Sequence, residues 1–280
     1  MTGDRSAPPD TRDLLRKYEL QPKRSFSQNF LIQPAAIAQI ADAARAMGEQ
    51  VVELGPGLGA LTHALLERGA RVLAVELDRD MIRVLDAEFA DHDRLEVRLG
   101  DAADLDLEAY SKGCGSKLVV TGNLPYQATG AIIRRVVAHR EVLEGAILMV
   151  QKEVRDRLIA SPATKEYGAL TVFTRAAFEV ATVCRLRPGS FYPPPKVDSA
   201  VVRFTPRDKP LAEETESFRQ VVRAAFQMRR KTLHNALRAL GDAARSTRAL
   251  SEAGIDPRRR GETLSVEEFA TLTQCWDAGV

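Results

Sequence analysis

The segment Glu53-Leu54-Gly55-Pro56-Gly57-Leu58-Gly59 follows Val51-Val52 and decides the fold. Residues 51–54 form a short run typical of a buried strand, and helical periodicity begins at Leu58. Glycine permits a positive φ and a close approach of a ligand to the backbone, and the first turn of a helix offers free amides. The spacing is G-x-G-x-G. The segment predicts a strand, a ligand-binding turn and a helix, although such a turn can also be only a tight connection.

Short β-branched runs alternate with helical patterns through the first two-thirds of the chain. This alternation predicts a parallel sheet covered by helices on both faces. The expected strands are residues 51–54, 71–76, 95–99, 117–121 and 146–150, and the expected helices are 58–68, 78–89, 129–139 and 152–160.

The alternation of strand and helix patterns ends after residue 178. Residues 179–186 and 197–204 read as two strands joined by a proline-rich turn, which predicts an antiparallel pair at the end of the sheet. No strand signal remains after the segment 205–210, so we place a domain boundary at about Pro206 to Pro210. Beyond it the expected helices are 218–228, 230–240, 243–253 and 265–276, the last with capping-box spacing from Ser265 to Glu268.

Composition excludes several classes of protein. The chain has 280 residues, 45% hydrophobic and 28% charged, which is an ordinary globular mixture. No apolar run approaches the roughly 18 residues that span a bilayer, and the polar N-terminus lacks a signal-peptide core. Cys114, Cys184 and Cys275 are scattered without metal-ligand spacing, so neither a disulfide framework nor a metal site is expected. We therefore expect a soluble cytoplasmic protein that is monomeric, since nothing in the sequence demands a dimer.

The net charge of +2 hides a division along the chain. Between Val72 and Tyr110 twelve acidic residues face four arginines, whereas between Arg219 and Arg260 eleven basic residues face three acids. A basic C-terminal third is the electrostatic footprint of a phosphate-backbone binder, although a solvated helix face has the same composition. The candidate RNA-binding residues are Arg223, Arg229, Arg230 and Lys231.

Carboxylates follow the next two strands after the glycine turn. Glu76 ends the second strand, twenty-one residues after Gly55, where a carboxylate can accept hydrogen bonds from both hydroxyls of a ribose. Asp101, preceded by Gly100, ends the third strand. Ligands of open α/β sheets bind at the carboxyl ends of the strands, so the pattern predicts an adenosine cofactor with its ribose on Glu76 and its adenine near Asp101. No lysine or serine completes a P-loop, and NAD remains possible from the turn alone.

The fourth strand ends in Asn123-Leu124-Pro125-Tyr126. An asparagine at a strand end is often only a turn residue, but here it lies beside the predicted cofactor cleft. The arrangement suits methylation of the exocyclic amine of a base, which is a poor nucleophile and needs acceptors for its hydrogens. The side-chain oxygen of Asn123 and the backbone carbonyl of Leu124 can be those acceptors, while the Tyr126 ring can stack on a base drawn out of its helix. Catalysis would rest on positioning for in-line attack on a sulfonium methyl.

Two further segments belong to this pattern. Residues 191–197, Phe-Tyr-Pro-Pro-Pro-Lys-Val, could close over the opposite face of the base, although polyproline also makes a stiff hairpin connection. Ser27-Gln28-Asn29-Phe30-Leu31 precedes a helix that Pro34 begins, and could fold over the cofactor.

Taken together and in order, these motifs resemble those of the rRNA adenine N6,N6-dimethyltransferases, most closely the members that act on the small ribosomal subunit. The resemblance covers residues 28 to about 204. It implies a Rossmann-like class I methyltransferase domain, with a mostly parallel seven-stranded sheet and an antiparallel end strand, followed by a small all-α domain. The division that follows is an N-terminal extension at 1–27, an S-adenosylmethionine-dependent methyltransferase domain at 28–206 and a helical RNA- and ribosome-binding domain at 211–280.

The resemblance also implies roles for single residues. The target adenine would be held by Asn123, Leu124 and Tyr126, with Phe191 on its other face. The implied substrate is a pair of adjacent adenosines in a hairpin near the 3′ end of 16S rRNA, within the 30S particle. The cofactor would be S-adenosylmethionine, with S-adenosylhomocysteine as product and no metal, bound by Asn29, Leu31, Gly55, Gly57, Glu76, Asp101 and Asn123.

Other functions remain open. The Erm type, which dimethylates an adenosine of 23S rRNA, shares these motifs; Leu124, where Erm proteins commonly have isoleucine, and the long basic C-terminal domain favour the small-subunit enzyme. A non-catalytic RNA-binding assembly factor is disfavoured by the intact motif at 123–126, because binding alone does not require that geometry. A nicotinamide dehydrogenase is disfavoured by the glycine spacing and by the lack of an evident catalytic His/Lys pair.

Overall fold

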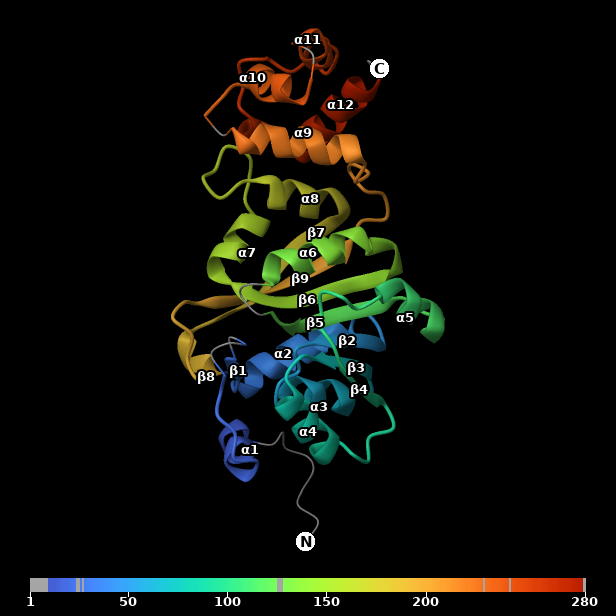
Figure 1. Cartoon of the computed structure of the whole chain (residues 1–280), viewed down its shortest axis with the longest axis vertical. Coiled ribbons are helices and arrows are strands. Elements are labelled where there is room, and N and C mark those ends of the chain that lie inside the picture. The colour runs from blue at the N-terminus through green and yellow to red at the C-terminus, as the bar shows by residue number, and fades with distance from the viewer. Residues whose placement is uncertain are drawn as a thin grey trace. The chain divides into compact units, whose positions relative to one another are not determined.

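A computed structural model describes residues 10–23, 26, 28–124, 128–228, 230–241 and 243–278 of the protein (Figure 1). The chain divides into two compact units. The first comprises the chain up to Arg155 together with Ala181–Pro206, and the second comprises Asp156–Val180 and the chain from Arg207 onward. The expected division assigned residues 156–180 to the first domain, whereas the structure groups them with the C-terminal helices.

A seven-stranded sheet organises the first unit, in the order β4-β3-β2-β5-β6-β9-β7. The pairs β3–β4, β2–β3, β2–β5 and β5–β6 are parallel, and β9 runs antiparallel to β6. The expected α/β fold with a mostly parallel sheet is confirmed, and β7 lies outside the antiparallel β9 at the edge. The strands are β2 (Gln50–Leu54), β3 (Arg71–Glu76), β4 (Leu95–Leu99), β5 (Leu118–Asn123), β6 (Leu143–Gln151), β7 (Phe178–Leu186) and β9 (Ser199–Pro206).

The strand order reverses between β2 and β5, which lie side by side. From β2 the chain continues outward to β3 and β4, and from β5 it continues the other way to β6. Gly122 makes the close approach of the two strands possible, because its φ is 154° and an added Cβ would lie 2.2 Å from the carbonyl oxygen of Leu54. Such a reversal point is where open α/β sheets bind their ligands.

The helices of the first unit bury apolar stripes against this sheet. Ile37, Ile40 and Ala41 of α2 share one core with Leu65 of α3 and with alternate residues of the strands, such as Ile147 and Met149. Asp78 caps α4 by accepting a hydrogen bond from the Asp80 amide at 3.0 Å. These helices are α2 (Pro34–Arg45), α3 (Ala60–Glu67), α4 (Arg79–Glu88), α5 (Leu107–Cys114) and α6 (Thr129–Ala138).

The N-terminal part of the chain adds a helix and a two-stranded sheet that the sequence analysis does not predict. Helix α1 (Thr11–Lys17) packs Leu14 and Leu15 against Met81 and Val84 of α4. Strand β1 (Phe30–Leu31) pairs antiparallel with β8 (Phe191–Tyr192), with Leu31 opposite Phe191. The segments at 28–31 and 191–197 are thereby joined (Figure 1).

The second unit is helical in its described residues after Pro206. Phe218, Leu233, Leu250 and Phe269 lie in one apolar core to which each long helix contributes. The predicted capping box is confirmed, with reciprocal hydrogen bonds between Ser265 and Glu268. The helices are α8 (Ala169–Ala177), α9 (Glu216–Gln227), α10 (Leu233–Leu237), α11 (Ala243–Glu252) and α12 (Val266–Asp277), while α7 (Lys152–Leu158) crosses the division between the units.

Within the described ranges, no helix is both long and apolar enough to cross a membrane. The same residues contain no group of three His, Cys, Asp or Glu side chains that could hold a metal ion. Cys114, Cys184 and Cys275 are free thiols.

Candidate functional site

A cavity of about 280 Å³ lies in the first unit at the carboxyl ends of the central strands. It is lined from the glycine turn, the ends of β3, β4 and β5, the segment 28–31 and β8. The structure therefore gathers in one cavity residues that the sequence places as far apart as positions 29 and 191. The predicted site residues in its wall are Asn29, Leu31, Gly55, Gly57, Glu76, Asp101, Asn123, Leu124 and Phe191.

The glycine turn is packed tightly from both sides. Gly57 has a φ of 57°, and a Cβ there would lie 2.9 Å from the ring of Phe30. Its amide donates a hydrogen bond of 3.1 Å to Oε2 of Glu76. A side chain at position 57 would separate the turn from β1, so the turn needs glycine for its backbone angle and for this contact.

Glu76 is the best-anchored carboxylate in the cavity. Besides the Gly57 amide, the amides of Leu77 and Asp78 donate to its Oε1 at 2.8 and 2.9 Å. The side chain is only 8% exposed, and burial raises its pKa above the ordinary 4.5, against the opposing effect of the three amides. A carboxylate has about four acceptor positions, so Glu76 can still accept from a ligand hydroxyl.

Glu53 is a second buried carboxyl in the cavity wall, and the sequence analysis assigns it no role. It is 1% exposed, and its Oε2 accepts a hydrogen bond of 2.6 Å from the Thr62 hydroxyl. Burial, together with the nearby charge of Glu76, raises the pKa of Glu53 to about 7 despite the Thr62 hydrogen bond. The cavity therefore holds two desolvated carboxyls behind the glycine turn.

Asn123 ends β5 with its side chain fixed. Its Nδ2 donates to the backbone carbonyl of Asn29 at 2.8 Å, which leaves Oδ1 as the acceptor of the amide. The next residue, Leu124, is buried, and its amide donates to the carbonyl of Met149 at 3.2 Å. Pro125 and Tyr126 lie outside the described residues.

The remaining predicted residues reach the cavity from other elements. Asp101, after β4, accepts a hydrogen bond of 2.8 Å from the Ala103 amide. Phe191 is 4% exposed and packs in the same core as Leu31. Phe191 therefore lines the same cavity as Asn123 and Leu124.

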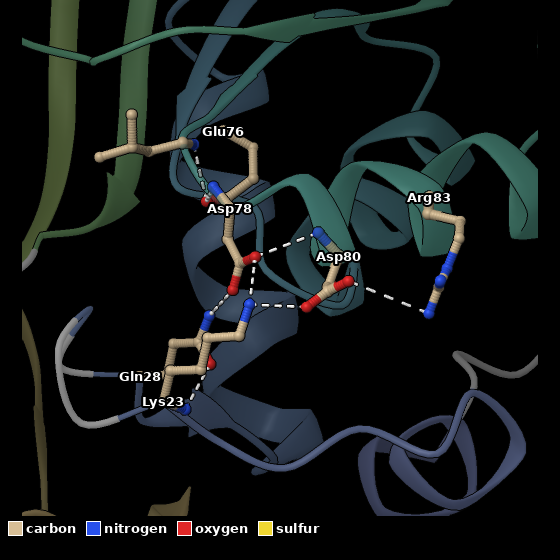
Figure 2. Close-up of polar contacts among 7 residues, drawn as sticks. Lys23, Gln28, Glu76, Asp78, Asp80 and Arg83 are labelled. Carbon is tan, nitrogen blue, oxygen red and sulfur yellow. Dashed lines mark hydrogen bonds and ion pairs between the residues drawn. The ribbon is translucent and has the colours of Figure 1, made fainter.

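A polar cluster beside Glu76 is a feature that the sequence analysis misses. Figure 2 shows Lys23 and Gln28 reaching the side chain of Asp78. The residues lie fifty or more positions apart in sequence, so no local motif joins them. The only signal in the sequence is the acidic spacing of Glu76, Asp78 and Asp80 after β3.

The predicted RNA-binding residues belong to the second unit. Arg223 is exposed on α9, and Arg230 and Lys231 are exposed just after that helix. Arg229 lies outside the described residues. None of Arg223, Arg230 and Lys231 lines the cavity described above.

Comparison with known proteins gives the family. The model of the ribosomal RNA adenine dimethylase family matches residues 19–277. A ribosomal RNA small subunit methyltransferase A from Geobacter metallireducens is 42% identical over 269 residues, which cover 93% of this chain and 97% of that protein.

Two solved structures are similar along most of the chain. A dimethyladenosine transferase from Plasmodium falciparum has a TM-score of 0.75 at 26% identity, covering 87% of this chain and 95% of its own. The 23S rRNA methyltransferase ErmE has a TM-score of 0.68 at 28% identity, covering 89% of this chain and all of its own. On the family match and the identity to its relative, the chain belongs to the ribosomal RNA adenine dimethylase family.

Proposed function

We propose that the protein transfers methyl groups from S-adenosylmethionine to the N6 amines of two adjacent adenosines in a hairpin near the 3′ end of 16S rRNA, in the 30S particle. One observation carries the proposal: Asn123 and Leu124 line the same cavity as the glycine turn and Glu76. Two oxygen atoms that can accept the hydrogens of an amine, from Asn123 and Leu124, are therefore available in the cavity that contains the predicted nucleoside-binding residues. The 42% identity to a small subunit methyltransferase supports the 30S particle over 23S rRNA as the substrate.

The cavity residues fit S-adenosylmethionine. This cofactor supplies an electrophilic methyl group on a positively charged sulfur. Glu76 is held by three amides with an acceptor position left for a ribose hydroxyl, and Asp101 is the acceptor for the adenine amine. The carboxylates of Glu76 and Asp101 in the wall suit a cationic ligand and oppose a phosphate. Asn29, Leu31, Gly55, Gly57 and Asn123 complete the proposed cofactor contacts.

The target amine would meet acceptors at the end of β5. Oδ1 of Asn123 and the backbone carbonyl of Leu124 accept the two amine hydrogens, so that the nitrogen lone pair is freed from the ring for attack. Phe191 stacks on one face of the adenine and Tyr126 on the other. No strong general base is needed, because the methylated nitrogen is cationic and readily loses its proton. Catalysis rests on the orientation of the amine toward the methyl group.

The second unit would hold the rRNA. Arg223, Arg230 and Lys231 are exposed and can pair with phosphates, and Arg229 completes the run in sequence. We propose that the protein acts as a monomer in the cytoplasm during small-subunit biogenesis.

A mass-spectrometric assay tests the proposal. The protein and S-adenosylmethionine are incubated with unmethylated 30S particles and, separately, with 23S rRNA, and each RNA is digested to nucleosides. We expect N6,N6-dimethyladenosine in the 30S sample alone. Dimethyladenosine only in 23S rRNA would move the function to the Erm type, and none in either sample would favour an RNA-binding assembly factor.

The variant Asn123→Ala ties the activity to the site. We expect it to lower kcat by about 100-fold or more, because both orientation and an acceptor are lost, while the affinity for S-adenosylmethionine falls much less. Turnover comparable to that of the wild type would remove Asn123 from its proposed role.

A further inference from the structure

Lys23 and Gln28 converge on the side chain of Asp78 (Figure 2). Nζ of Lys23 lies 2.7 Å from Oδ1 of Asp78 and 2.6 Å from Oδ2 of Asp80. Nε2 of Gln28 donates to Oδ2 of Asp78 at 2.8 Å, and its Oε1 accepts from the Lys23 amide at 2.8 Å. Both side-chain oxygens of Asp78 are therefore bound by residues of the N-terminal segment, which is the part of the chain from Lys23 to Leu31.

Asp78 connects this cluster to the proposed cofactor site. Its side chain is 3% exposed, whereas that of Lys23 is 35% exposed. Its backbone amide donates to Oε1 of Glu76 at 2.9 Å. A change in the position of Asp78 would therefore move one of the backbone amides that hold the Glu76 carboxylate.

We propose that Lys23 and Gln28 are positioning residues that hold Glu76, through Asp78, in the geometry that binds the ribose of S-adenosylmethionine. The inference rests on the proposed function. Lys23 and Gln28 would set the affinity for the cofactor and leave the methyl-transfer step itself unchanged.

The electrostatics of the cluster give the physical reason. Burial alone would raise the pKa of Asp78, but the hydrogen bonds from Lys23, the Asp80 amide and Gln28 lower it overall, so the carboxylate stays ionised. A buried carboxylate without its cation is strongly unfavourable. Without Lys23, Asp78 would turn toward water and draw its amide away from Glu76.

The same contacts hold the N-terminal segment against the cavity. Phe26, Gln28, Asn29, Phe30 and Leu31 all line it. The carbonyl of Asn29 fixes the amide of Asn123, so the segment also reaches the far side of the site. Lys23 and Gln28 therefore lie at the point where this segment is tied to the turn after β3.

Calorimetry on the full-length protein tests the proposal, with S-adenosylmethionine and S-adenosylhomocysteine as ligands. We expect Lys23→Met to raise the Kd of both ligands about tenfold, which corresponds to a loss of about 1.4 kcal/mol in binding free energy. Turnover at saturating cofactor should stay within about twofold of the wild type, so that KM rises and kcat does not. Lys23→Arg should restore most of the affinity, since a cation is retained.

Lys17→Met is the matched control. Lys17 belongs to the same N-terminal part of the chain and pairs with Glu88 of α4 at 2.5 Å, so the variant loses the same charge and an ion pair of the same kind. Neither Lys17 nor Glu88 lines the cavity. We expect its Kd to stay within about twofold of the wild type, because Tyr18 still donates to Glu88.

A milder variant covers the case in which Lys23→Met does not fold. Gln28→Ala removes one hydrogen bond from Asp78 and leaves the ion pair, and we expect its Kd to rise about fivefold. Unchanged affinity in the Lys23 and Gln28 variants, with normal binding by the wild type, would overturn the inference alone. Equal losses in Lys17→Met and Lys23→Met would overturn it too, by indicating general destabilisation. A wild type that does not bind S-adenosylmethionine would overturn the proposed function as well.

Discussion

At the scale of single residues, the two buried carboxyl groups behind the glycine turn differ in the hydrogen bonds that they accept. Glu76 is bound by three backbone amides, whereas Glu53 has a hydrogen bond from one hydroxyl, that of Thr62. Amide donors stabilise the ionised form of a carboxyl group, so Glu76 is the better acceptor for a ligand hydroxyl. The ionised form of Glu53 is less well stabilised.

This difference predicts a pH-dependent stability for the variant Glu53→Gln. The pKa of Glu53 is about 7 in the folded protein and near 4.5 when unfolded. Below pH 4.5 both states are protonated, so burial of this group costs no ionisation energy. Between pH 4.5 and pH 7 the unfolded state ionises while the folded state keeps its proton, so the wild type loses stability across this window, and above pH 7 both states are ionised and the loss is complete. We expect the variant to gain roughly 2.5 kcal/mol over the wild type between pH 5 and pH 8, most of it below pH 7.

Denaturant unfolding at pH 5, 6, 7 and 8 measures this gain, with the exposed Glu67→Gln as the control for the loss of one carboxylate. A stability difference between Glu53→Gln and the wild type that does not change over this range would show that Glu53 titrates normally.

At the scale of elements, the reversal of strand order between β2 and β5 creates the cavity, and Gly122 permits it. The variant Gly122→Ala would force a Cβ to within 2.2 Å of the Leu54 carbonyl oxygen at a φ of 154°, which L side chains rarely adopt. We expect a loss of about 3 kcal/mol or more in the free energy of unfolding, or failure to fold. Thermal and denaturant unfolding check this.

Gly113→Ala provides the matched comparison for that variant. Gly113 lies in α5 with no atom within 4 Å of an added Cβ, so alanine should stabilise the helix by about 0.5 to 1 kcal/mol. Equal stability of the two variants would contradict the close approach of β2 and β5.

The strands of the sheet could be predicted because each is either a short apolar run or, as in β4 and β7, a run that includes alternating polar and apolar residues, bounded by turn residues. Elements that depend on distant partners could not. Helix α10 begins at Leu233 rather than near Arg230, because the amides of Leu233 and His234 bind the carbonyls of Arg259 and Pro257. Helix α8 contains Thr171, Val172 and Thr174, which favour strands, and folds as a helix through burial of its apolar face in the core of the second unit.

The candidate site shows the same limit. The ends of β2, β3, β4 and β5 could be predicted to meet, because carboxyl ends of parallel strands share one edge of a sheet. Asp78 gave no such signal, since its partners Lys23 and Gln28 come from a segment without periodicity. A contact across fifty residues is decided by tertiary packing, and a single sequence does not record it.

At the scale of the whole molecule, the acidic residues of the cavity and the proposed RNA-binding residues belong to different units of the chain. Acidic residues gather in the cavity wall of the first unit, while exposed Arg223, Arg230 and Lys231 belong to the second. An acidic cavity suits a cationic ligand and exposed arginine and lysine side chains suit a phosphate backbone, so the two proposed binding tasks use local charges of opposite sign.

This division predicts separable effects on RNA and on cofactor. Charge reversal in Arg230→Glu with Lys231→Glu should weaken rRNA binding and lower the slope of log K against log salt by about 1.4 to 1.8, because two phosphate contacts release their counterions. The affinity for S-adenosylmethionine should not change, since neither residue lines the cavity. Lys112→Glu with Lys117→Glu is the matched control, because these exposed lysines lie before β5, at the strand end away from Asn123. A salt slope that falls equally in both double variants would mean that the RNA responds only to net charge; a slope that falls only in the first would assign phosphate contacts to the second unit.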